Sequence, residues 1–214
     1  MATYADMQNR IGDELGRAEL IVGGASVART KTAILDAIKG WKNYRFRFNE
    51  LSTTLTTVAG TTDYTTATGL TDGIIEIDEM TIVYSGSRCR MDEVTASEYA
   101  DMNASNPATR GVPSYYAWYG DTLRLYPAPN AVYTITIYYH GEILPVLSSD
   151  SDTNAWTNQG ETLIRNTAKA DLCANVLRDP QAAQLAQQAA ELSFKSLRRE
   201  YDARSLTGRI DPHD

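Results

Sequence analysis

The clearest alternation of apolar and polar positions in the chain lies between residues 111 and 141. Successive side chains of a strand point to opposite faces, and β-branched and aromatic residues favour this backbone, so the pattern indicates strands. The predicted strands cover residues 112–118, 122–126 and 132–139. Gly120 suits a tight turn between the first two strands, and Pro127 interrupts the second connection because proline has no N–H to donate. The pattern therefore predicts a three-stranded meander.

Apolar residues three or four positions apart, which indicate helices, dominate the two ends of the chain. The predicted helices cover residues 4–20, 27–47, 159–177 and 180–203. Further strands are expected at 51–58 and 74–84, and a capping box at Thr95 and Glu98 predicts a short helix between strands. Helices that flank a β segment in this way most simply pack as one bundle.

The predicted fold class is α+β, a four-helix bundle (two N-terminal and two C-terminal helices) with an inserted antiparallel β-sheet domain. The predicted domains are a helical bundle domain (1–50 and 146–204), an inserted acidic Tyr/Thr-rich β domain (51–145) and a C-terminal tail (205–214). The tail has no periodic pattern and too few apolar residues to fold alone, but it can become ordered on a partner.

The composition, 43% hydrophobic and 22% charged, is ordinary for a globular protein. No run approaches the roughly 20 apolar residues of a membrane span. The polar, acidic N-terminus does not resemble a signal peptide, so we expect synthesis and assembly in a cytoplasm. Cys89 and Cys173 lack metal-type or redox-type spacing, and we expect free, reduced thiols.

The net charge of −7 is unevenly distributed. Residues 51–145 hold eleven acids against four arginines and no lysine, and they also hold ten of the thirteen tyrosines. Affinity for nucleic-acid phosphates comes from lysine and arginine, so an acidic chain is a poor candidate for gripping DNA.

Candidate catalytic chemistry is sparse. His140 and His213 have no ligand at metal-binding spacing, and no Ser–His or Cys–His motif is present, so we expect no catalytic, cofactor-binding or metal-binding residue and no cofactor. The exception is a set of carboxylates: alternation places Glu76 and Asp78 on one face of a strand, and residues 92–93 add two more acids. Two carboxylates across a sugar can hydrolyse a glycosidic bond. A peptidoglycan hydrolase and a solvated strand face are both compatible with these acids.

Aromatic side chains are concentrated in the predicted sheet. They are Tyr115, Tyr116, Trp118, Tyr119, Tyr126, Tyr133, Tyr138 and Tyr139. Cross-strand pairing within one sheet explains them, and so does a face that binds sugars or another protein. A glycan-binding β module therefore stays open as well. The basic run from Lys195 to Arg204 fits either a solvated helix end or a docking surface.

The order of motifs along the chain resembles the head-to-tail adaptor (head-completion, or connector) proteins of short-tailed bacteriophages. The similarity covers about residues 4–205. The matching motifs begin with a helix that holds Ile34, Ile38 and Trp41, followed by Arg47-Phe48-Asn49. A Thr-rich strand then leads into Ala59-Gly60 and Asp63-Tyr64, and the 74–83 strand follows. The last motifs are Gly111-Val112-Pro113 with Tyr116 and Trp118, the LRLYPAP run at 123–129, the 133–139 strand and two final helices. At 64–66 this chain has Tyr-Thr-Thr where the family usually has an aromatic-x-Pro.

The resemblance implies a structural virion protein that is not an enzyme. A ring of twelve copies would dock under the portal protein, extend the DNA channel, and provide the platform for a tail nozzle or tail-hub protein. Genomic DNA would pass through without sequence-specific binding. The expected portal-contact residues are Arg198, Arg199, Tyr201, Leu206, Arg209 and Ile210. The expected channel-lining acids are Glu76, Asp78, Asp92 and Glu93.

Overall fold

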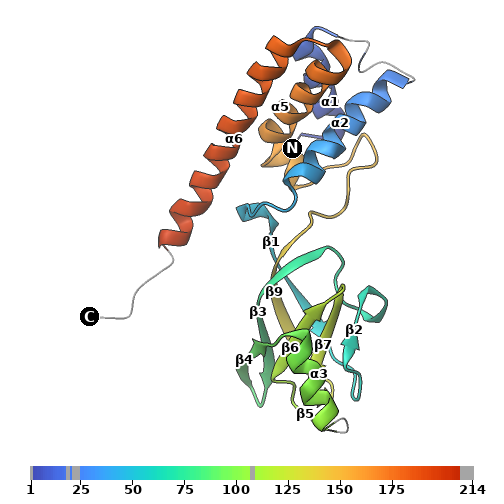
Figure 1. Cartoon of the computed structure of the whole chain (residues 1–214), viewed down its shortest axis with the longest axis vertical. Helices are drawn as coiled ribbons and strands as arrows, with labels where there is room; N and C mark the ends of the chain where they lie inside the picture. Colours follow the sequence, from blue (N-terminus) through green and yellow to red (C-terminus); the bar gives the residue numbers. More distant parts are fainter. Residues whose placement is uncertain (1, 18–19, 21–24, 107–108, 208–214) are drawn as a thin grey trace. The chain divides into compact units, whose positions relative to one another are not determined.

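The computed structural model describes residues 2–17, 20, 25–106 and 109–207, and for 25–28 and 203–207 it describes the backbone alone. The chain divides into two compact units (Figure 1). The helical unit comprises Met1–Asn49 and Ile143–Asp214, and the β unit comprises Glu50–Glu142. The mixed α+β class is confirmed, whereas a regular four-helix bundle stays a prediction.

The helical unit is formed from both ends of the chain. Its elements are α1 (Tyr4–Leu15), α2 (Ala25–Trp41), a 3₁₀ turn (Arg47–Asn49), α4 (Ala155–Asn158), α5 (Glu161–Asp171), a π-helix (Leu172–Leu177) and α6 (Pro180–Thr207). Figure 1 shows α6 as the long orange-red helix beside α5. One hydrophobic core joins α1, α2, α5 and α6, with Trp156 of α4, only 1% exposed, among its largest side chains.

Local hydrogen bonds end α1 and α2 earlier than predicted. Helix α1 stops before Gly16, not at residue 20, because Gly16 adopts the left-handed backbone (φ 61°) of a C-terminal cap and donates its N–H to the Asp13 carbonyl. Helix α2 ends at Trp41, not at 47. The buried Asn49 side chain replaces the next helical turn, since its Oδ1 accepts the Phe46 N–H at 2.7 Å and its Nδ2 donates to the Tyr44 carbonyl at 2.8 Å.

The C-terminal helices begin differently from the prediction. Two helices stand where one was predicted over 159–177. The first, α4, is capped by Asn154, whose side chain accepts the N–H groups of Trp156 and Thr157. A separate helix, α5, then starts at Glu161 without a side-chain cap. The predicted start of the last helix at residue 180 is confirmed, and it is capped by Asp179, whose Oδ1 accepts the Ala182 N–H at 3.0 Å.

The β unit contains a seven-stranded sheet, an α-helix, a 3₁₀ turn (Thr66–Thr68) and a small two-stranded sheet. The strands are β1 (Glu50–Thr56), β2 (Asp63–Tyr64), β3 (Ile74–Tyr84), β4 (Ser87–Glu93), β5 (Arg110–Gly111), β6 (Tyr115–Tyr119), β7 (Thr122–Tyr126), β8 (Ala128–Pro129) and β9 (Thr134–Gly141). The sheet order is β1-β9-β3-β4-β6-β7-β2, and β5 pairs with β8. Helix α3 (Ala96–Ser105) starts at the predicted Thr95–Glu98 capping box.

Two predictions about the sheet are wrong. The sheet is not wholly antiparallel, because α3 forms a crossover between β4 and β6, and a crossover returns the chain in the same direction. The meander is also incorrect. Strands β6 and β7 form the predicted hairpin, in which Gly120 and Asp121 both have positive φ, but β9 pairs with β1 and β3.

The sheet curls around a single core, and one tyrosine holds its two edge regions together. Buried side chains from β1, β2, β3, β4, β6, β7 and β9 share this core. Strands β1 and β2 are the edges of the sheet. The hydroxyl of buried Tyr64 on β2 accepts the N–H of Val58, just beyond β1, at 2.9 Å and donates to the Val58 carbonyl at 3.3 Å. These bonds replace part of the strand pairing that the edges lack.

Replacing Tyr64 with phenylalanine tests this link. We expect Tyr64→Phe to lower the free energy of unfolding of the β unit by about 0.5–1.5 kcal/mol, because the Val58 N–H and carbonyl lose their hydrogen-bond partner. Urea unfolding measures the loss, and hydrogen exchange of the Val58 amide should become faster. The control is Tyr119→Phe, at a side chain that is 64% exposed. Equal stabilities for the two variants would contradict the proposed role of the hydroxyl.

Candidate functional site

The C-terminal half of α6 has one side against the core and one side exposed. Phe194 and Leu197 pack against the core of the helical unit. Arg198 and Arg199 are exposed, and Tyr201 is partly buried. The structure therefore presents two of the expected portal-contact arginines to solvent on one rigid element.

The other expected portal contacts lie at or beyond the end of this helix. Leu206 belongs to the last turn of α6, where the structure describes the backbone alone. Arg209 and Ile210 lie outside the described residues. The contact role of the whole set stays a prediction.

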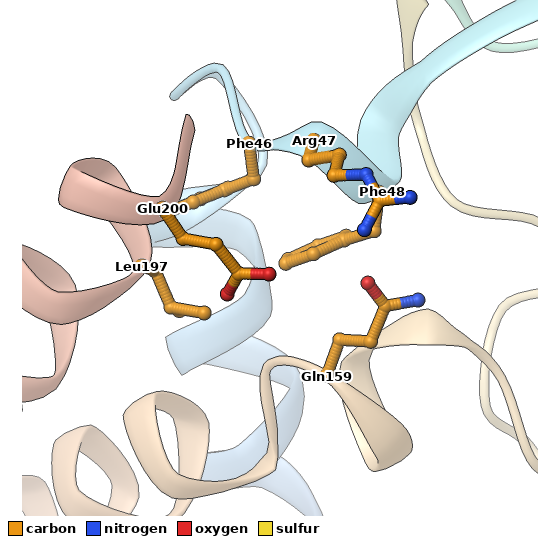
Figure 2. Close-up of a pocket in the computed structure, with 6 residues that line it drawn as sticks. All are labelled: Phe46, Arg47, Phe48, Gln159, Leu197 and Glu200. Atoms are coloured by element: carbon orange, nitrogen blue, oxygen red, sulfur yellow. The ribbon is translucent and has the colours of Figure 1, made fainter. Parts of the chain in front are cut away.

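A pocket of about 150 Å³ lies beside the same part of α6 (Figure 2). It is lined by Phe46, Arg47, Phe48, Gln159, Leu197 and Glu200. Figure 2 shows the Glu200 carboxylate and the Gln159 amide both pointing into the space beside the Phe48 ring. The pocket thus combines an apolar wall with a cation, an anion and an amide.

Aromatic packing makes the wall of this pocket rigid. The rings of Phe46 and Phe48 are stacked, with centroids 5.1 Å apart and planes 4° apart. Phe48 also meets Trp156 edge-on at 5.0 Å. A cavity of ~150 Å³ can hold one benzene-sized group. The pocket can therefore accept a single apolar side chain, while Arg47 and Glu200 can pair with charged neighbours of that side chain.

The sequence analysis did not identify this pocket. Arg47-Phe48-Asn49 was part of the family resemblance and Glu200 follows the predicted arginines, but nothing in the sequence indicates that these segments meet. Asn49 brings them together, because it turns the chain after α2 and thereby places Phe46 and Phe48 against Trp156.

Strand β3 carries more exposed acids than alternation predicts. Its pairing with β9 is shifted between Ile77 and Glu79, and this bulge leaves one extra residue, Asp78, between the paired positions. Asp78 and Glu79 are both exposed, whereas strict alternation would bury one of them. Glu76 lies nearer the start of the strand, opposite His140. The sequence analysis therefore missed Glu79.

Three of the four expected channel-lining acids lie around one tyrosine. Burial is the main reason that the pKa of Tyr116 rises from its usual 10.0 to about 12, and the negative charges of Glu93, Asp78 and Asp92 raise it further, while Arg90 lowers it. Asp92 and Glu93 are exposed on β4, which runs beside the tyrosine's strand, β6. The structure thus brings acids from β3 and β4 into one electrostatic neighbourhood. Their position in a channel stays a prediction.

The other sequence candidates have mainly structural surroundings. His140 is buried, at 2% exposed, on β9 between β1 and β3. His213 lies outside the described residues. Cys89 is exposed and Cys173 buried, and both are free thiols, as predicted. The tyrosines of the predicted aromatic cluster fall into two groups. Tyr116 and Tyr139 are buried in the core, whereas Tyr115, Tyr119, Tyr126, Tyr133 and Tyr138 are partly or fully exposed.

The positions of these residues do not support a metal site or a hydrolase active site. Within the ranges that the structure describes, no group of three His, Cys, Asp or Glu side chains is arranged to hold a metal ion. The pocket of Figure 2 is lined by none of the four predicted acids. No helix of the described part of the chain is long and apolar enough to cross a membrane.

Comparison with known proteins agrees with the resemblance seen in the sequence. The model of the SU10 adaptor protein family matches residues 2–212. The chain belongs to the SU10 adaptor protein family. This membership confirms the predicted resemblance to phage head-to-tail adaptors and indicates a structural role as a phage adaptor. A search of curated proteins gave no match.

The acids around Tyr116 make a test of the local electrostatics possible. We expect Glu93→Gln to lower the pKa of Tyr116 from about 12, although burial, the larger cause, should keep it above 10.0. An NMR titration of labelled tyrosine measures the shift. Asp121→Asn, in the β6–β7 turn, should leave this pKa unchanged, and equal shifts in both variants would contradict the acid cluster.

The same tyrosine predicts a pH dependence of stability. Because the folded pKa of Tyr116 is raised, its contribution is fully present below pH 10 and is lost as the pH rises through about 12. We expect Tyr116→Phe to reduce the loss of β-unit stability over this range. Urea unfolding at several alkaline pH values measures the difference, and parallel curves for wild type and variant would refute it.

Proposed function

We propose that the protein is a head-to-tail adaptor of the phage virion that forms a ring under the portal, extends the DNA channel and gives the tail its attachment platform. The observation that carries this proposal is the adaptor-family match over residues 2–212. A structural role of this kind requires rigid surfaces for several partners, and the chain has two compact units, each with its own core.

The portal contact is assigned to the end of α6 and the docking tail that follows it, residues 205–214. Arg198 and Arg199 offer two exposed guanidinium groups, which suit acidic side chains of a partner. The neighbouring pocket can receive one apolar side chain as an anchor, and a buried anchor surrounded by charged residues is typical of an interface hot spot. Leu206, Arg209 and Ile210 are assigned to the same portal contact on the basis of the family resemblance.

The remaining partners follow from the family resemblance. The assembled ring contains twelve copies, and its other face binds the tail nozzle or tail-hub protein. Genomic DNA passes through the ring without sequence-specific contacts, in keeping with the net charge of −7 per chain. The acids Glu76, Asp78, Asp92 and Glu93 face the channel and repel the phosphates during ejection. The protein lies at the head–tail interface of the virion.

Charge reversal on α6 tests the portal contact. We expect Arg198→Glu with Arg199→Glu to weaken binding to purified portal rings by tenfold or more, since losing two charge pairs costs on the order of 1–2 kcal/mol or more. Surface plasmon resonance measures the affinity. Arg29→Glu, an exposed position on α2, is the matched control. Removal of residues 205–214 should abolish ring formation on the portal, and mixed rings formed by the shortened chain would contradict the tail assignment.

Charge reversal in the β unit tests the channel acids. We expect Asp92→Lys with Glu93→Lys to slow DNA release from assembled particles, because DNA phosphates would then adhere to the channel wall. Triggered ejection, followed by a DNA-binding dye, measures the rate at low and high salt, and salt should reduce the effect. Asp121→Lys with Asp101→Lys changes the net charge equally at other exposed sites and serves as the control. A release rate unchanged from wild type would count against a channel position.

A further inference from the structure

A second, larger hollow in the helical unit has an apolar lining and its own internal polar bonds. We call it the alanine groove. It has a volume of about 460 Å³, about three times the ~150 Å³ that accommodates a benzene. Its lining residues are Trp41, Thr167, Ala170, Asp171, Ala174, Ala183, Gln187, Ala190 and Glu191. They come from α2, α5, the π-helix and α6.

The polar groups in the floor of the alanine groove already have partners. The Trp41 Nε1–H donates to Thr167 Oγ1 at 2.9 Å, and that hydroxyl donates to the Leu163 carbonyl at 2.9 Å. The described buried side-chain atoms without a hydrogen-bond partner belong to Thr81 and Arg165, and neither residue lines the groove. The floor therefore favours an apolar occupant over a polar ligand.

The opposite side of α6 carries two exposed leucines. Leu185 is 62% exposed and Leu192 is 67% exposed. They lie seven residues apart, which is two helical turns or about 10.5 Å. Ala183 and Ala190 of the groove have the same separation. At about 100° per residue, each leucine points roughly 180° away from these alanines. One helix thus presents a pair of projecting leucines on one side and a matching pair of small residues on the other.

Charge complements this match in shape. Lys195 is exposed one turn after Leu192, on the flank of α6 between the leucine side and the alanine groove. The rim of the alanine groove carries the acids Glu191 and Asp171. A second copy that brings its leucine side to the groove therefore also brings a cation to an acidic rim. These charges would favour one orientation of the second copy over the reverse one.

We propose that Leu185 and Leu192 of one copy insert into the alanine groove of the next copy. The two surfaces lie on opposite sides of α6, so a chain cannot fill its own groove. For the same reason, two copies related by a two-fold axis cannot each insert their leucines into the groove of the other. The contact is heterologous, and such contacts close into a ring when the rotation between copies allows it. This inference rests on the proposed ring and names its copy-to-copy contact.

Disulfide trapping tests the contact and its polarity in one experiment. Two variants, Leu192→Cys and Gln187→Cys, are made in a Cys89→Ser background, which removes the exposed native thiol. We expect cross-linked dimers when the two variants are mixed at high concentration under mild oxidation, and little product from either variant alone. Cross-linking of Leu192→Cys with itself would indicate a symmetric contact and overturn the proposal, as would the absence of a product in the mixture.

Sedimentation of the concentrated full-length chain provides the second measurement. We expect Leu192→Asp to weaken self-association by about tenfold or more, because the substitution removes the apolar side chain that would be buried in the groove of the next copy. Val132→Asp, on the β unit and also 67% exposed, should have no effect. Equal association of both variants, or a wild-type chain that stays monomeric, would refute the contact. Portal binding by a single copy is measured separately, so loss of the copy-to-copy contact and failure of the adaptor function give different results.

Discussion

The helical unit depends on ion pairs and apolar contacts that α5 makes with the N-terminal helices. Arg165 of α5 contacts Glu14 of α1 at 3.1 Å and Glu161 at 3.2 Å, and Arg10 contacts Glu161 at 3.3 Å. The Arg165 and Glu161 side chains are only 18% and 11% exposed. Removing one member of such a largely buried pair is destabilising, because the other charge keeps its desolvation penalty without its partner. The N-terminal helices therefore complete their core only with a helix that follows the β unit in the sequence.

This dependence links the core to the proposed docking surfaces. Helix α5 packs along α6 and so holds α6 with Ala190 buried and the leucine side in solvent. The same core orients Phe48 and Trp156, which form and support the wall of the pocket beside Glu200. The proposed portal contact and the proposed copy-to-copy contact thus occupy different parts of one rigid helix. A packed core beneath both surfaces holds them in place before binding, which lowers the entropic cost of assembly.

Sequence reasoning succeeded where neighbouring residues determine the structure. The Thr95–Glu98 box starts α3, alternation defines β7 with its observed bounds, and Asp179 with Pro180 starts α6. It failed where contacts between residues distant in the sequence determine the structure. The place of β9 between β1 and β3 depends on pairing across more than 50 positions, and the pocket depends on Asn49 turning the chain toward Trp156. Neither kind of contact leaves a periodic signal, so the sequence identified the arginines of α6 but not the pocket beside them.

The central claim is that copies of this protein assemble on a portal ring. Negative-stain imaging of purified portal mixed with the protein tests it most directly. We expect a second ring of density on one end of the portal, coaxial with its channel. This ring should be absent when glutamates replace Arg198 and Arg199 of α6. Portal rings that remain unchanged in the presence of excess wild-type protein would contradict it.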